Sequence, residues 1–72
     1  MTQHTKTLVN EILDAITRRY VLTGMSIPAD VLALKDETMD IFSKAMSEKD
    51  PEKMRLYEAR IDEIHATILP RG

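Results

Sequence analysis

The sequence predicts an all-α fold, a small antiparallel bundle of three helices that associates with a second copy. The alternative is a helical hairpin of the second and third helices, with the first helix docked on it from the same chain or from another copy. Leucine, isoleucine, alanine and methionine dominate its apolar residues, glycine occurs only twice, and no stretch alternates apolar and polar residues as a strand does. The chain has 72 residues, so we expect one domain, residues 1–72, with a small core. Self-association is a natural way for so short a chain to gain additional core.

The clearest helix is predicted over about residues 51–69. Its apolar residues recur at alternating steps of three and four, which is typical of a narrow seam packed against another helix. Asp50 is a favourable N-cap, and Pro51 is a favourable first residue because its missing N–H would have no partner there. The seam consists of Met54, Tyr57, Ile61, Ile64 and Ile68.

A first helix is predicted over about residues 5–22. Thr5 or Thr7 is expected to cap its N-terminus, so that residues 1–4 form a frayed polar end. Gly24 follows the helix, where glycine readily takes the left-handed conformation that ends one. A broad apolar face is formed by Leu8, Val9, Ile12, Leu13, Ile16 and Tyr20.

A second helix is predicted over about residues 27–46, with Pro28 in its first turn. Apolar residues cover about half of its circumference, which favours the middle position, in contact with both other helices. Lys35 falls inside this arc, where its stem would pack and its ammonium group reach the edge, or where it would contact an acidic partner. Core filling is expected of the methionines, with an adaptable binding surface as the alternative. The methionines concerned are Met25, Met39, Met46 and Met54.

No motif typical of an enzyme, a metal site or a cofactor site is recognisable. Cysteine is absent, and the two histidines, His4 and His65, lie far apart in the sequence. Neither a glycine-rich phosphate loop nor a serine–histidine–aspartate set on a sharp turn is present. His65 shares the apolar face of the third helix, so we expect it to be packed and hydrogen-bonded. The sequence therefore predicts a protein that is not an enzyme and binds no cofactor.

Charges of both signs are interspersed along the chain. Ten basic and twelve acidic residues leave a net charge of −2, which argues against binding to nucleic acid or to an anionic membrane. In the third helix, acidic and basic residues alternate, and we expect a solvated charged face there. It comprises Arg55, Glu58, Arg60, Asp62 and Glu63. No apolar run is long enough for a membrane span or a signal peptide, and a cytoplasmic protein is expected.

The leading functional hypothesis is a non-enzymatic protein–protein interaction module. It would be a small regulatory, adaptor or chaperone-like protein of bacterial, phage or plasmid origin. Its amphipathic helical faces would bind another protein or a second copy, as a homodimer. The candidate contact residues are Lys35 and the apolar residues at or beyond the edges of the main seams. They are Val21, Leu22, Met25, Lys35, Leu56 and Leu69.

A small DNA-binding transcriptional regulator is an alternative. Arg18 and Arg19 are followed by a turn with glycine and then by a helix, which is the order of a helix-turn-helix motif. Lys35 would add a third contact to nucleic acid. The second helix, however, carries acidic residues where a recognition helix needs arginine, lysine, asparagine or glutamine.

Residues 8–44 resemble the small sporulation aspartyl-phosphate phosphatases, which are helical hairpins. The shared residues are Gly24, Ser26, Pro28 and the run Val31-Leu32-Ala33-Leu34. That family continues with Ser-Gln-Glu-Leu-Asp, where this chain has Lys35-Asp36-Glu37-Thr38-Met39-Asp40. The resemblance implies a helical hairpin, and the missing motif means that the phosphatase activity is not carried over.

Residues 39–63 resemble the hairpins of type III secretion needle proteins and small co-chaperones. An amphipathic helix and a charged turn ending in proline carry this resemblance, with Lys49, Asp50, Pro51, Met54, Tyr57, Ile61 and Glu63. It implies a secretion-system component as a further alternative. The first thirty residues depart from those families, and neither family is assigned.

Overall fold

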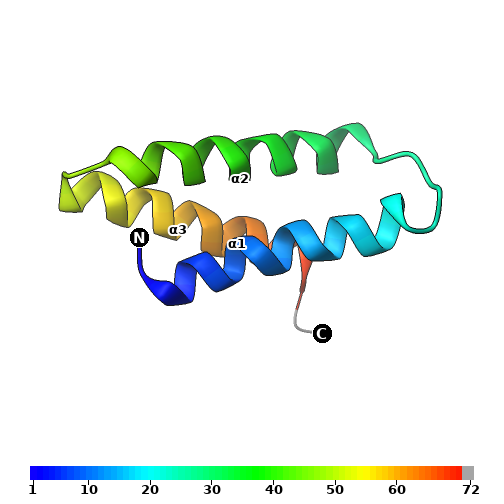
Figure 1. Cartoon of the computed structure of the whole chain (residues 1–72), viewed down its shortest axis with the longest axis horizontal. Helices are drawn as coiled ribbons and strands as arrows, with labels where there is room; N and C mark the ends of the chain where they lie inside the picture. The colour runs from blue at the N-terminus through cyan, green and yellow to red at the C-terminus, as the bar shows by residue number, and fades with distance from the viewer. Residues whose placement is uncertain (71–72) are drawn as a thin grey trace.

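The structure is a computed structural model that describes residues 1–70, which are all-helical apart from their connections, with three helices packed against each other. The helices are α1 (Gln3–Ile16), α2 (Ala29–Ser47) and α3 (Pro51–Ile68). A π-helical segment, η1 (Thr17–Val21), continues α1. α1 and α3 run in the same direction and α2 runs in the opposite one (Figure 1). The predicted all-α bundle of three helices is confirmed.

The core forms mainly where α1 meets α3. Its buried apolar cluster comprises Leu8, Val9, Ile12, Ala15 and Ile16 of α1, Ile41 of α2, and Ile61, Ile64 and Ile68 of α3. Of the three helices, α3 packs most extensively against the other two. The prediction that the second helix is central was therefore wrong. Its apolar arc is wide, but α2 buries only Thr38, Ile41 and Ala45.

The start of α1 also differs from the prediction. The helix begins at Gln3 and is capped by Thr2, whose hydroxyl accepts a hydrogen bond from the Thr5 amide at 3.2 Å. The threonines predicted as caps lie inside the helix, and Thr5 is buried. Glu58 of α3 accepts hydrogen bonds from the Thr2 amide at 2.8 Å and from the Thr5 hydroxyl at 3.4 Å. This tertiary contact orders the end that was expected to fray.

The remaining helix boundaries lie within two residues of the predicted ones, a normal margin for helix ends. α2 begins later than predicted because Pro28 is its N-cap rather than part of its first turn, and the Pro28 carbonyl accepts from the Leu32 amide at 2.9 Å. At α3 the predicted cap is confirmed, since the Asp50 carboxylate accepts from the Glu52 amide at 3.0 Å. Pro51 is the first residue of that helix, as predicted.

Gly24 ends the first helical segment as predicted. Its φ of 72° lies in the left-handed region, and the turn is closed by a bond of 2.8 Å from the Met25 amide to the Tyr20 carbonyl. The Thr23 hydroxyl donates to the Arg19 carbonyl at 2.7 Å and so supplies a partner for another carbonyl of the last turn. The chain then leads through residues 25–28 to α2.

Replacing Gly24 with alanine is expected to lower the free energy of unfolding by about 1 kcal/mol, because an L-residue is strained at positive φ. A Cβ atom at this position would meet no other atom within 4 Å, so the cost is that of the backbone alone. Urea denaturation of both proteins measures it. Gly24→Asn should cost less, since asparagine tolerates this conformation better. Equal stability of the alanine variant would contradict the role given to the turn.

The charged face of α3 is only partly the solvated surface that was predicted. Arg60 donates to the two carboxylate oxygens of Glu37 on α2, at 2.5 and 2.8 Å, and to Glu63 at 3.2 Å. The hydrogen bond from Arg60 lowers the pKa of Glu37, and the same bond raises the pKa of Arg60. Because both side chains are more than a third exposed, this pair orients α2 on α3 more than it stabilises the fold.

Candidate protein-interaction surface

Three of the predicted contact residues gather at the connection between α1 and α2. Val21, Leu22 and Met25 are 58%, 73% and 60% exposed, and they lie within five consecutive residues around the Gly24 turn. We call these three residues the turn patch. Exposed apolar side chains that gather in one place are a feature of many protein-binding sites.

The turn patch is exposed because α3 does not extend far enough to cover it. Figure 1 shows the connection between η1 and α2 projecting beyond the end of α3. Here Arg19 donates to the carbonyl of Ile68 at 2.7 Å, which gives a partner to a carbonyl at the end of α3. The segment that carries the turn patch is thereby held against the body of the bundle at its base.

Leu69 lies at this base rather than in the turn patch. It is partly buried and lines a shallow hollow of about 310 Å³ between α1 and the end of α3. The other lining residues are Glu11, Asp14, Ala15, Arg18 and Arg19. Leu69 is thus a neighbour of the Arg19 contact, on the side of the bundle where α1 meets α3.

Leu56 and Lys35 are not brought to the turn patch. Leu56 is exposed in the second turn of α3, near the connection between α2 and α3, which lies at the opposite end of the bundle (Figure 1). Lys35 is partly buried in the middle of α2. The six predicted residues therefore occupy four separate places, and only the turn patch is a cluster.

α2 carries a second apolar row that the prediction had assigned to the core. Leu32, Met39 and Met46 are 40%, 52% and 78% exposed, and they recur every seven residues. Lys35 and Phe42, both partly buried, lie between them at helical spacing. We call Leu32, Lys35, Met39, Phe42 and Met46 the outer stripe. The expectation of core filling was wrong for Met39 and Met46, because α1 and α3 leave their side of α2 exposed, and for Met25, which lies in the connection before α2.

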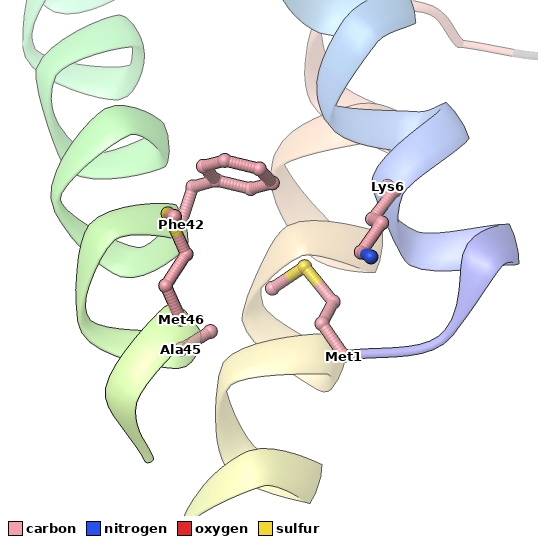
Figure 2. Close-up of a pocket in the computed structure, with 5 residues that line it drawn as sticks. All are labelled: Met1, Lys6, Phe42, Ala45 and Met46. Atoms are coloured by element: carbon pink, nitrogen blue, oxygen red, sulfur yellow. The ribbon is translucent and has the colours of Figure 1, made fainter.

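The outer stripe borders a groove between α1 and α2. The groove has a volume of about 330 Å³ and is lined by Phe42, Ala45 and Met46 of α2, and by Met1 and Lys6. In Figure 2 the side chains from the two sides face one another, with the ribbon of α3 behind them. The groove is therefore apolar on the side of α2 and carries a lysine on the side of α1.

His65 is packed and hydrogen-bonded, as predicted. Its side chain is partly buried, and its Nε2 atom lies 3.2 Å from a carboxylate oxygen of Glu11 on α1. His4 and His65, distant in the sequence, line the same shallow hollow of about 480 Å³, together with Asp62. Within residues 1–70, no three histidine, aspartate or glutamate side chains are placed so that they could hold a metal ion.

The basic residues considered for nucleic-acid binding have other partners in the structure. Arg18 pairs with Asp14 at 3.0 Å, and Arg19 donates to the end of α3 as described above. Lys35 lies on a different helix, within the outer stripe. The arrangement does not gather these three side chains into one basic surface.

None of the helices described in the structure is long and apolar enough to cross a membrane. Comparison of the chain with protein-family models, with curated proteins and with solved structures found no match.

Proposed function

We propose that the protein is a non-enzymatic interaction module, a small adaptor or regulatory protein that binds another protein through the turn patch. The support is the clustering of Val21, Leu22 and Met25, each more than half exposed, at one end of the bundle. These side chains supply no nucleophile and no acid or base, so the chemistry of this surface is that of binding.

The partner would present an apolar surface, such as one face of an amphipathic helix. Leucine and methionine are flexible and can adapt to such a surface, and the ordered base at Arg19 limits the entropy lost on binding. A few buried apolar anchors usually carry most of the binding energy of an interface. Leu22, the most exposed of the three, is the anchor that we expect to contribute most.

The test uses a double variant, Leu22→Asp with Met25→Asp, and the matched control Leu56→Asp. Each protein is used to capture partners from extracts of the source organism, and a protein recovered by the wild type is purified. We expect this partner to bind the wild type and the control equally, and to bind the double variant at least about tenfold more weakly. Circular dichroism verifies that all three proteins are folded.

Equal binding of the purified partner to the wild type and to the double variant would refute the role of the turn patch. Recovery of the same proteins from the extract by the wild type and by the double variant would also refute it. Loss of binding in the Leu56→Asp control would instead move the site to α3.

A further inference from the structure

The outer stripe has the pattern of a helix seam that is covered only in part, since Phe42 packs against the core cluster while Leu32, Met39 and Met46 are exposed. Its residues follow one another at steps of three and four, which is the heptad spacing of helices that pack side by side. The residues of α2 that face the core, Thr38, Ile41 and Ala45, form a separate row with the same steps. α2 therefore has two seams, and within the bundle only the inner one is fully covered.

The exposed area of the chain is consistent with an uncovered seam. A folded monomer of this mass typically exposes about 4,500 Å². This chain exposes 5059 Å², about a tenth more. Leu32, Met39 and Met46, each at least 40% exposed, contribute to that area together with the turn patch and Leu56.

We propose that the outer stripe pairs with the outer stripe of a second copy of this chain, with the two α2 helices antiparallel. The charges in and beside the stripe select this occupant. Lys35 lies within the stripe, and Asp36 and Asp40 follow it toward the polar side of α2, where Asp40 also pairs with Lys44 at 2.9 Å. A parallel pair would place each Lys35 against the other, where like charges repel. In an antiparallel pair centred between Lys35 and Met39, each Lys35 lies opposite Met39 of the other copy. The same segment of that copy carries Asp36 and Asp40.

The groove beside the outer stripe fits the same occupant. Phe42 and Met46 of the stripe line it, and Lys6 lies on its α1 side. An α2 helix from a second copy that covers Phe42 and Met46 would also cover the side of the groove that α2 forms.

The dimer is separate from the proposed function because it uses α2 and not the turn patch. One stripe per copy buries less than the roughly 800 Å² per partner of a standard stable complex, so we expect association at micromolar to millimolar concentrations. The turn patch lies outside the pairing segment and remains available to another protein in the dimer.

Sedimentation equilibrium of the full chain over that concentration range tests the proposal. The wild type is expected to approach twice its monomer mass of 8.2 kDa as concentration rises. Met39→Lys places a positive charge opposite Lys35 of the other copy and is expected to weaken association at least about tenfold. Leu56→Lys, which introduces the same charge at an exposed position outside the stripe, should associate like the wild type. Circular dichroism verifies that both variants remain helical.

A charge exchange tests the orientation and the identity of the occupant together. The Lys35→Glu variant and the double variant Asp36→Lys with Asp40→Lys should each remain monomeric, because like charges then meet across the seam. An equimolar mixture of the two should form a heterodimer, since both sets of opposite charges are restored. A wild type that stays monomeric at the highest concentration, a Met39→Lys variant that dimerises normally, or a mixture that does not associate would each overturn the proposal. None of these results would affect the turn patch.

Discussion

Replacing Ile61 with alanine is expected to lower the free energy of unfolding by about 2–5 kcal/mol, the usual cost of truncating a large buried aliphatic side chain. Ile61 is fully buried, at 0% exposure, in the cluster where α3 meets α1. A chain of 72 residues has a total stability of only about 4–11 kcal/mol, so the variant should lose a large part of it. Thermal and urea unfolding, followed by circular dichroism, measure the loss.

Leu56→Ala is the matched control for this experiment. Leu56 lies on the same helix but is 69% exposed, so its truncation should change stability by no more than about 0.5 kcal/mol. If the two variants were destabilised equally, the packing of α3 described here would be wrong. If Leu56→Ala alone were destabilised, α3 would have to present its other side to the core.

Replacing Glu58 with glutamine is expected to lower stability at neutral pH by about 1–2 kcal/mol, because hydrogen bonds to a charged acceptor are stronger than those to a neutral one. The hydrogen bonds from the Thr2 amide and the Thr2 and Thr5 side chains lower the pKa of Glu58 below its ordinary value of 4.5. A carboxyl group with a lowered pKa stabilises the fold above its unfolded-state pKa, and this stabilisation is lost as the pH falls through the folded-state pKa. Unfolding is therefore measured from pH 7 down to pH 3.

The wild type should lose stability mainly below about pH 4.5, and the Glu58→Gln variant should lose less over the same interval. Asp62→Asn is the control, because Asp62 is an exposed carboxylate on the same helix. Its acid profile should resemble that of the wild type. A Glu58→Gln variant whose acid profile parallels that of the wild type would show that Glu58 does not hold the N-terminus of α1. Glu37, whose pKa is also lowered, accounts for part of the loss that remains.

Local sequence features were sufficient to predict the helices. Asp50 and Pro51 mark the start of α3, and Gly24 marks the turn after η1, because caps and left-handed turns depend on a few neighbouring residues. The start of α1 was predicted wrongly because it depends on a contact with a residue that is distant in the sequence. Thr2 caps that helix, and it is held by Glu58, a residue 56 positions away.

The candidate surfaces were predicted less completely. Val21, Leu22 and Met25 could be identified because they lie beyond the apolar face of the first helix, and nearness in sequence also makes them neighbours in space. Leu56 was correctly expected off the seam of α3. The outer stripe was missed, although its seven-residue repeat is visible in the sequence. Half of the circumference of α2 is apolar. The sequence pattern does not show which part of this apolar face packs on the core and which part remains exposed.

The sequence by itself determined that this protein is helical, where its three helices lie, and which residues of α1 and α3 are apolar enough to pack, since periodicity, caps and turn residues act over a few positions. Only the tertiary structure decided that α3 and not α2 packs most extensively against the other two helices, that Arg19 and Glu58 hold distant segments together, and that Met39 and Met46 are exposed. These features depend on which apolar faces meet. A helix with a wide apolar arc can pack on its neighbours through different parts of that arc. In this structure α2 places one row of the arc in the core and leaves much of the other row exposed.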